Sequence, residues 1–447
     1  MKKIFLTMFM AACVTAAFSE GYQVNLQSTK QAGMGHVGTA MKLGAESMHF
    51  NPAGLSYMDK TVDLSGGASF ILSNVDYDYS SPDGVCEFST DSKMSTPIYL
   101  YAGVKILDDL AAGISVTNPY GSGLTWPENW AGAHLVQSIS LKTFAIQPTV
   151  SYKLFNDRLS LGAGMMIMTG DVSIGRALMP VNSLVPMMGP DFADVVPVQA
   201  ELSGKAKVGL GYNVGVMFDI TDQWTVGASY RSKVNMELEK GTAEVSYNVP
   251  EPVQQVIIQS GKVPPLNQGT FAASMPMPAN LTFGVSYKPV KKLILSADFQ
   301  YVFWSAYEQL DIEFSKEDWN GNNGYKISSV KDYSNAFAVR LGGQYNVISC
   351  LDVRLGAYFD KTPVNDKYYN PETPGADKIG VTAGLSYSPF KNFSIDASFA
   401  YVHGIKKENV SCIVTPADEI TGTPEVRFYG NYQPTALMPS VGVSYKF

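Results

Sequence analysis

Charged side chains recur within apolar, alternating segments of this 447-residue chain. Five fall on the alternate positions that point away from the apolar face: Arg231, Asp298, Arg340, Arg354 and Asp396. A guanidinium group binds carboxylates through paired, charge-assisted hydrogen bonds, so Arg340 and Arg354 could dock a ligand carboxylate. Alternatively, they pair with Asp298 and Asp396 in a network that solvates an enclosed space and holds a plug there. We favour the pairing network, and both interpretations require segments that lie side by side.

Residues that usually carry catalysis or bind metals are scattered along the chain. The four histidines are His36, His49, His134 and His403. No Cys or His spacing fits a zinc site, and no nucleophile elbow or phosphate-binding loop is present. We therefore predict no enzyme activity, no metal site and no cofactor. The net charge of -7 argues against a nucleic-acid partner, which would need a basic face.

Period-two alternation extends from Thr61 to the C-terminus and indicates β-strands. Short polar turns alternate with long connections, an asymmetry typical of outer-membrane barrels. Counting the segments predicts a transmembrane antiparallel β-barrel of about fourteen strands, and bacterial single-chain barrels have even numbers. The long, extracellular connections are expected at 75–95, 119–134, 177–203, 248–276, 317–332, 364–376 and 408–432.

The strand ends carry the signature of a membrane interface. Tyrosines precede a short turn or the terminus, as an aromatic girdle would: Tyr152, Tyr287, Tyr345, Tyr387 and Tyr445. In the last segment Val441, Val443, Tyr445 and Phe447 are expected to face lipid, while Gly442, Ser444 and Lys446 face the lumen. This terminus resembles the assembly signal of bacterial outer-membrane barrels. The resemblance implies the barrel assembly machinery and outer-membrane lipid as partners.

The N-terminus predicts export. Residues 1–19 combine Lys2 and Lys3 with a short apolar run and small residues before Glu20, the pattern of a cleaved signal peptide. A lipoprotein leader ending at Cys13 is the less favoured alternative, because Met10 matches such signals poorly. Beyond the leader no apolar stretch reaches the ~20 residues of a transmembrane helix.

Residues 20–60 do not alternate and are expected to form a plug inside the barrel of residues 61–447. They include the Gly-rich stretch 31–38 and the turn Asn51-Pro52-Ala53-Gly54. A segment of about forty irregular residues is too long for a simple tail. Its aromatic and apolar content argues against disorder.

These residues together resemble the FadL-type family of long-chain fatty acid and hydrocarbon transporters. The resemblance is carried by Gly21-Tyr22-Gln23, Asn51-Pro52-Ala53-Gly54, Asn118-Pro119-Tyr120-Gly121, Trp126, Trp130 and Phe447. It implies a plugged barrel that takes up hydrophobic molecules, such as fatty acids or hydrocarbons, by facilitated diffusion. It further implies an extracellular groove, movement of the plug, and lateral exit through the wall at a kinked third strand. It also places Asn51, Pro52, Ala53 and Gly54 against the gap in the wall as plug or gating residues, whereas their residue types alone indicate a turn.

The two longest loops are unusually apolar for extracellular segments. Residues 177–203 contain Leu178, Met179, Leu184, Val185, Met187, Met188, Phe192, Val195 and Val196, and residues 248–270 contain Val253, Val256, Ile257 and Ile258. Such a surface fits a hydrophobic ligand groove, and methionine suits it because its side chain repacks around varied shapes. The alternative is a closed hydrophobic cap that binds no ligand. The competing function is a barrel of the same type that binds protein partners, for example in a secretion system.

Two cysteines fall in loops that are expected outside the cell. Cys86 and Cys412 belong to the first and last hairpins, which become neighbours when a barrel closes. A disulfide between them and two unpaired thiols are equally compatible with the sequence. Cys350 falls in a turn expected in the periplasm.

Overall fold

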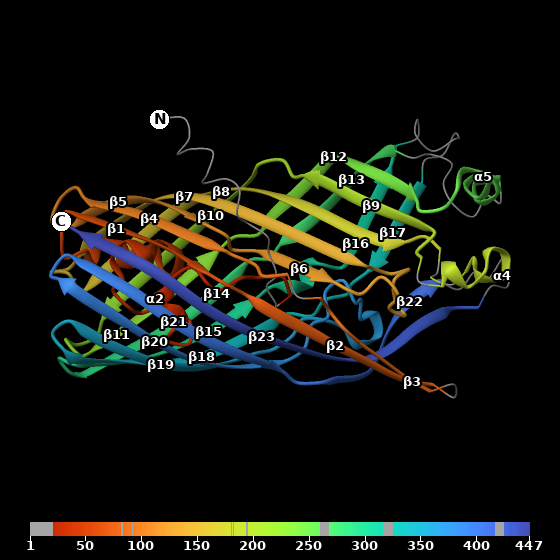
Figure 1. Ribbon diagram of the computed structural model, residues 1–447. Coiled ribbons are helices and arrows are strands. Elements are labelled where there is room, and N and C mark those ends of the chain that lie inside the picture. The colour runs from red at the N-terminus through yellow and green to blue at the C-terminus, as the bar shows by residue number, and fades with distance from the viewer. Residues whose placement is uncertain are drawn as a thin grey trace, which may run out of the picture.

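The computed structural model describes residues 21–81, 84–91, 93–179, 181, 183–193, 195–259, 268–315, 325–415 and 424–447. Its strands form one antiparallel sheet that closes into a barrel of 14 strands (Figure 1). Closure occurs where β1 (Val62–Ser69) pairs with β23 (Val426–Lys446), with Leu64 opposite Tyr445. The predicted all-β barrel is confirmed.

Several barrel strands consist of two segments, separated by a bend or break. In chain order the remaining segments are β2 (Leu72–Ser81), β3 (Gly84–Ser89), β4 (Ile98–Lys105), β5 (Leu110–Thr117), β6 (Gly121–Thr125), β7 (Ser138–Leu154), β8 (Leu159–Ala177), β9 (Val198–Lys205), β10 (Gly209–Asp219), β11 (Trp224–Arg231), β12 (Val234–Tyr247), β13 (Gln268–Met277), β14 (Asn280–Val290), β15 (Leu293–Val302), β16 (Gln309–Phe314), β17 (Tyr325–Val330), β18 (Ala336–Ile348), β19 (Leu351–Asp360), β20 (Lys378–Phe390), β21 (Phe393–Gly404) and β22 (Lys407–Thr415).

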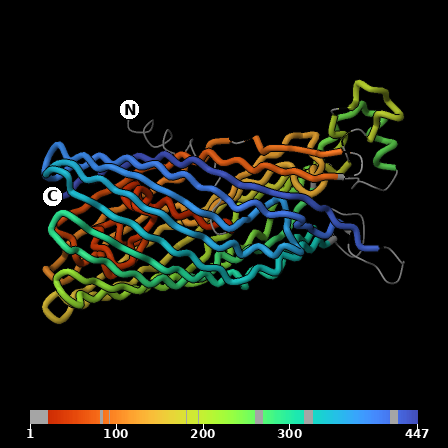
Figure 2. The backbone as a smooth tube through the Cα atoms, turned by 90° about the horizontal axis from the view of Figure 1, so that it is seen from below, coloured from red at the N-terminus to blue at the C-terminus, as the bar shows by residue number. Residues whose placement is uncertain are grey.

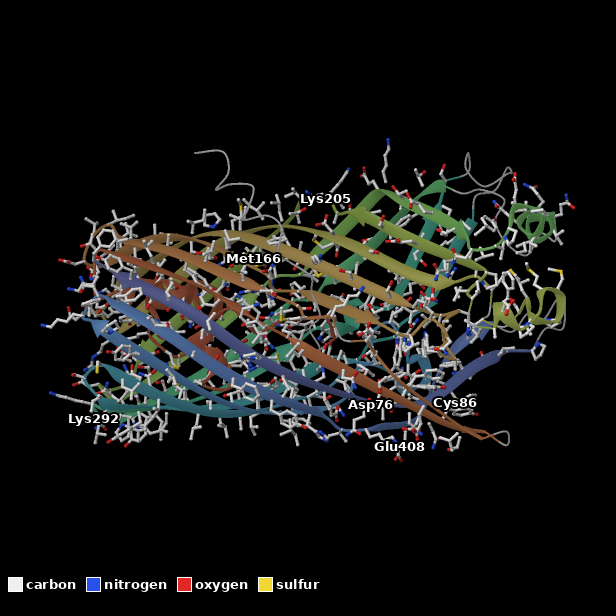
Figure 3. The ribbon with its side chains drawn as sticks, in the orientation of Figure 1. Asp76, Cys86, Met166, Lys205, Lys292 and Glu408 are labelled. Carbon is white, nitrogen blue, oxygen red and sulfur yellow. The ribbon has the colours of Figure 1, made fainter. Side chains whose placement is uncertain are left out.

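Alternation along the strands separates a lipid face from a luminal face, as expected. In β23 and at the residue after it, Val441, Val443, Tyr445 and Phe447 are between 46 % and 54 % exposed, whereas Ser440 and Ser444 are buried. Tyr152, Tyr345, Tyr387 and Tyr445 all stand exposed near the end that carries the short turns, and Tyr287 stacks on Trp224 there. Lys292, in one such turn, lies at the end of the barrel opposite Cys86 and Glu408 (Figure 3).

The long connections differ from the prediction, because strand pairing continues well into most of them. β2 and β3 extend into 75–95, β6 into 119–134, β9 into 177–203, β13 into 248–276, β17 into 317–332, and β22 and β23 into 408–432. Pairing between strands satisfies the backbone N–H and C=O groups whether or not lipid surrounds the strands. Past the membrane no lipid face imposes alternation, so the sequence pattern ends before the strands do.

The chain from Gly21 to Tyr57 lies inside the barrel, coloured red in Figures 1 and 2. It contains only short helices: α2 (Thr29–Ala32), η2 (Gly44–Glu46), α3 (Ser47–Phe50) and η3 (Pro52–Tyr57). The other helices are α4 (Val185–Met188), η4 (Pro190–Phe192), α5 (Glu251–Gln259), η5 (Trp304–Ala306) and η6 (Asp366–Tyr368). Within the described ranges, none of them has the length and apolar character to cross a membrane.

Wall glycines let this plug approach the barrel backbone closely. A Cβ atom at Gly162 would lie 2.3 Å from Pro52, one at Gly342 would lie 2.2 Å from the Met34 carbonyl oxygen, and one at Gly356 would lie 2.2 Å from the Gly35 nitrogen. Larger side chains there would displace the plug or the wall. Glycines on the luminal side of successive strands are the sequence signal for this close approach.

Two further expectations concern the ends and the cysteines. The predicted signal peptide, residues 1–19, and the alternative leader ending at Cys13 lie outside the described residues. Cys86, Cys350 and Cys412 are free thiols in the structure, with Cys86 exposed and Cys412 buried.

Candidate functional site

An apolar pocket lies inside the barrel on the extracellular side of the plug. Counting its open mouth, it holds about 860 Å³ of space free of protein atoms. Its walls come from β7, β8, β9, β12, β13 and β16, and its lining includes Ile139, Leu141, Val172, Ile174, Leu202, Met236, Leu238, Phe271, Met275, Met277, Leu310 and Ile312. This shape and lining suit a hydrophobic small molecule.

The pocket forms because inward-facing residues of these strands are apolar in the outer half of the barrel. In β8, Val172 and Ile174 line the pocket, and the buried Met166 and Met168 belong to the hydrophobic cluster that includes the lining residue Met236, while Met165 is exposed. Figure 3 labels Met166 between the two ends of the barrel. The sequence signal was the run Met165-Met166-Ile167-Met168, in which alternation disappears because both faces are apolar. The prediction did not use it and instead placed ligand contacts in the loops.

Tyr22, from the plug, forms part of the pocket lining. Its ring is fully buried, packs edge-on against Trp304 with centroids 4.7 Å apart, and donates its hydroxyl proton to the Pro276 carbonyl oxygen. Gly21 beside it has φ of 68°, and a Cβ there would lie 2.6 Å from the Trp304 ring. The conformation and the close contact explain why glycine precedes Tyr22.

The third barrel strand breaks beside Tyr22. β5 ends at Thr117, β6 begins at Gly121, and Pro119 lies in the gap. The plug pairs with the gap: the Val24 N–H donates to the Pro119 oxygen at 2.9 Å, and the Gly121 N–H donates to the Tyr22 oxygen at 2.8 Å. Proline has no N–H to donate to a neighbouring strand, so a break there is expected.

The side chain of Asn118 bridges the wall at this break. Its oxygen accepts the Ile98 N–H at 2.9 Å, and its amide donates to the Thr143 oxygen at 2.6 Å. Its backbone oxygen accepts from the Gln27 amide at 3.0 Å. The Asn118-Pro119-Tyr120-Gly121 motif therefore forms a wall defect that the plug completes.

A second, polar pocket lies on the other side of Tyr22. Gln23 contributes to it, together with Asn25, Gln27, His36, Thr39, His49, Ser229, Arg231, Asn280, Asp298, Gln300 and Arg340. Consecutive plug residues thus belong to two chambers of opposite character, with Tyr22 in the apolar one and Gln23 in the polar one.

The predicted luminal charges are all buried, and each contacts the plug or the wall. The Asp298 carboxylate accepts from the Gly38 N–H at 2.8 Å and the Thr39 N–H at 3.0 Å, and Arg231 donates to the His49 oxygen at 2.8 Å. Arg340 lies 3.5 Å from Asp360 and opposite Asp298 on the next strand. Asp298 and Arg231 thus hold the plug, and the ion pair of Arg340 is with Asp360, an acidic residue that the predicted network did not include.

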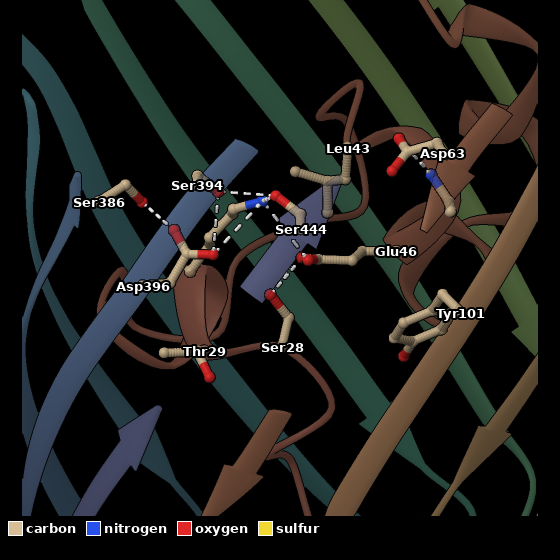
Figure 4. A network of polar contacts seen from close by, with 12 residues as sticks. Ser28, Thr29, Leu43, Glu46, Asp63, Tyr101, Ser386, Ser394, Asp396 and Ser444 are labelled. Atoms are coloured by element: carbon tan, nitrogen blue, oxygen red, sulfur yellow. Dashed lines mark hydrogen bonds and ion pairs between the residues drawn. The ribbon is translucent and has the colours of Figure 1, made fainter. Parts of the chain in front are cut away.

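Arg354 and Asp396 meet on the far side of the plug. The Ser386 hydroxyl accepts from Arg354 at 2.6 Å and donates to Asp396. From the plug, Lys30 lies 3.6 Å from both Asp396 and Glu46 and donates to the Ser444 hydroxyl at 3.0 Å. Figure 4 shows Ser386 pointing toward Asp396. Arg354 thus lies outside both pockets in the described lining and belongs to the contacts around the plug.

The Asn51–Gly54 turn anchors the plug to an intact part of the wall. Asn51 caps η3 by accepting the Ala53 N–H at 3.1 Å, and it donates to the Val216 oxygen of β10 at 3.0 Å. The Ala53 oxygen accepts from the hydroxyls of Ser151 at 2.8 Å and Ser160 at 2.7 Å. Pairing of β8 with β10 is continuous here, and the break in the third strand lies elsewhere, at residues 118–120.

The predicted loop residues gather at the extracellular end, where α4 and α5 project from the barrel (Figure 1). Leu184 and Ile257 are buried together with Val198, and Met188, Phe192 and Val253 pack against them. Val185 is partly buried, while Met187 and Val256 are 58 % and 55 % exposed. None of these predicted ligand residues is in the described lining of the apolar pocket, although Leu202 and Phe271, from the same two predicted connections, are.

Packing of the aromatic residues closes another part of the lumen. Trp126 and Trp130 stack with centroids 4.2 Å apart, and Tyr77 and Tyr432 pack around them.

No group of three or more His, Cys, Asp or Glu in the described part of the chain could hold a metal ion.

A family model described as outer membrane protein transport protein (OMPP1/FadL/TodX) matches residues 10–447. The chain belongs to this family. FadL/TodX proteins are transporters of the outer membrane, and this chain is an outer-membrane barrel of that type.

Relatives and solved structures agree with that assignment. The chain is 25 % identical to the putative outer membrane protein NMB0088 of Neisseria meningitidis, over 90 % of both chains. It is 24 % identical to the long-chain fatty acid transport protein of Escherichia coli K12, over 89 % of this chain and 91 % of that one.

Two crystal structures share the fold. A Pseudomonas aeruginosa FadL homologue superposes with a TM-score of 0.75 at 20 % identity, covering 96 % of this chain and 100 % of the other. The P. putida toluene transporter TodX gives a TM-score of 0.69 at 17 % identity, covering 96 % and 99 %.

Proposed function

We propose that this FadL-family barrel takes up hydrophobic small molecules from outside the cell by facilitated diffusion. The observation that carries the proposal is the apolar pocket that contains Tyr22 of the plug. Transfer of an apolar ligand from water into this apolar lining is favourable. Similarity to proteins named as fatty acid and toluene transporters supports this class of cargo.

The outer loops would be the first landing site. Met187 and Val256 are exposed on α4 and α5, and Leu184, Val185, Met188, Phe192, Val253 and Ile257 complete the surface or support it from below. α4 follows β8 and α5 follows β12, two strands that line the apolar pocket. A ligand captured there would thus be close to the wall of the pocket.

Exit would be lateral, at residues 118–120. The polar chamber containing Arg231, Asp298 and Arg340 opposes passage straight through the lumen, because an apolar molecule there would desolvate charged groups. Only two backbone hydrogen bonds join Tyr22–Val24 to the broken strand within the described contacts. Each contributes roughly 0.5–1.5 kcal/mol net, so the main cost of displacing this segment is exposure of the buried Tyr22 ring and not loss of the backbone pairing. Asn51, Pro52, Ala53 and Gly54 would anchor the plug while its N-terminal part moves.

The second candidate is a barrel that binds a protein partner through its outer loops. Exposure of Met187 and Val256 fits such a surface equally well. Arg340 and Arg354 would then serve only the plug, as they do in the transport proposal.

Uptake of radiolabelled oleate and toluene separates the two candidates. Cells that carry the barrel should accumulate one of these probes faster than cells that lack it. Equal uptake of both probes by the two strains would contradict transport. The matched variant is Met236→Glu, which should reach the membrane yet lose uptake, because Met236 is buried and lines the apolar pocket.

A further inference from the structure

A buried ion pair lies at the wall of the apolar pocket. Lys331 follows β17, and its ammonium group lies 2.8 Å from the Glu372 carboxylate. The Lys331 side chain is 1 % exposed and that of Glu372 is 14 % exposed. Glu372 and Thr373 contribute to the lining of the pocket, and the Thr373 hydroxyl lies 2.9 Å from that of Tyr333. The glutamate thus stands between the lysine and the pocket.

Glu372 is the charged side chain that the pocket presents. Among the described lining residues the charged ones are Asp171 and Glu372, and both are acidic. Asp171 is exposed and alternates with the inward-facing Gly170 and Val172, opposite Lys205 of β9, so its side chain belongs to the outer face. Lys331 itself is absent from this lining.

This arrangement disfavours an anionic ligand. A carboxylate that leaves water needs a cation or several hydrogen-bond donors to compensate its desolvation. The nearby cation is already paired with Glu372. Burial lowers the pKa of Lys331, but the charge and hydrogen bond of Glu372, together with Tyr333, raise it by more, so the pKa of Lys331 is raised and the lysine stays protonated. A second carboxylate beside Glu372 would be repelled.

We propose that Glu372 makes this pocket selective for uncharged hydrophobic molecules, because it forms the ion pair with Lys331 that a ligand carboxylate would otherwise form. The inference rests on the proposed transport function and specifies its cargo. It assigns to Glu372 the role of a specificity-determining residue that acts through Lys331. Removing the glutamate charge should therefore create a carboxylate site from a lysine already in place.

Binding of methyl palmitate and palmitate tests this selectivity, because the two probes differ only in their head groups. Each is titrated at pH 8.5 into the full barrel in lipid nanodiscs, where a free carboxyl with a pKa of roughly 4–5 is ionised. The wild type should bind the ester at least tenfold more tightly. Glu372→Gln should strengthen palmitate binding at least tenfold and change ester binding less than twofold.

Two variants control the result. Glu408→Gln removes an exposed acidic charge from β22 and should leave both affinities unchanged. Lys331→Met combined with Glu372→Gln removes the whole pair and should retain ester binding while losing the gain for palmitate. Heat-dependent mobility on gels establishes that each variant is a folded barrel.

The outcomes separate this inference from the proposed function. Equal affinity of the wild type for both probes would overturn the selectivity while leaving ligand binding intact. Unchanged palmitate binding in the folded Glu372→Gln variant would overturn the role of Glu372. Failure of the wild type to bind either probe would overturn the proposed function and this inference with it.

Discussion

Gln23 of the plug and Tyr120 of the wall face each other as an antiparallel pair. The hydrogen bonds flank this pair, from Val24 N–H to Pro119 and from Gly121 N–H to Tyr22, so it is of the narrow, non-hydrogen-bonded kind. The Cα atoms of such pairs are about 4.5 Å apart, within the range of a disulfide. The plug thus pairs with the barrel at the break in the third strand.

Cysteines at both positions should lock the plug to the wall. In a variant that carries Gln23→Cys and Tyr120→Cys, with the native cysteines replaced by serine, we expect oxidation to lower ligand uptake at least tenfold. Reduction should restore it. Each single-cysteine variant should show no redox response, and full uptake by the oxidised, cross-linked barrel would contradict exit through this gap.

Substitution of a luminal wall glycine should unseat the plug. A Cβ at Gly342 would lie 2.2 Å from the Met34 oxygen, whereas one at the adjacent Gly343 would come no closer than 3.3 Å, to the end of the Leu295 side chain. Overpacking usually costs about 1–3 kcal/mol, and a backbone clash more. Gly342→Leu should therefore lower the heat stability of the barrel and sensitise cells to vancomycin, while Gly343→Leu should do neither. Equal sensitivity of the two strains would show that the plug does not depend on this contact.

The two outer cysteines should differ strongly in reactivity. Burial raises the pKa of the Cys412 thiol to about 11, so at pH 8 on the order of a thousandth of it is the reactive thiolate. Cys86 is exposed. In single-cysteine variants a maleimide should label Cys86 at least about a hundredfold faster than Cys412. A disulfide between them in the wild type, seen by mass spectrometry of unreduced peptides, would contradict the free thiols of the structure.

The terminal phenylalanine should matter for assembly more than for intrinsic stability. The Phe447 N–H donates to the Val62 oxygen at 3.0 Å and its oxygen accepts the Val62 N–H at 2.7 Å, bonds that use only backbone atoms. Phe447→Ser should therefore refold in detergent like the wild type, yet accumulate several-fold less in the outer membrane. Phe390→Ser, which alters another exposed aromatic residue at the short-turn end of β20, is the control. Equal membrane levels of both variants would contradict a role in recognition by the assembly machinery.

The sequence alone determined the barrel and which face of its strands is apolar. Lipid requires alternate apolar residues, so Val441, Val443 and Tyr445 could be assigned to the outer face without coordinates. The same alternation placed Arg231, Asp298, Arg340, Arg354 and Asp396 inside, where the structure has them. Extracellular strand ends could not be predicted, because no lipid imposes a pattern on them.

Only the tertiary structure decided what the interior contains. The apolar pocket gathers Met236, Phe271 and Ile139 from strands far apart in the chain, and periodicity cannot tell which inward residues meet across a lumen. Lys331 and Glu372 are 41 residues apart, and their pairing depends on how two connections fold toward the same pocket. The alternation that fixes the wall depends on lipid, whereas contacts in the lumen depend on barrel closure and on where the plug lies against the wall.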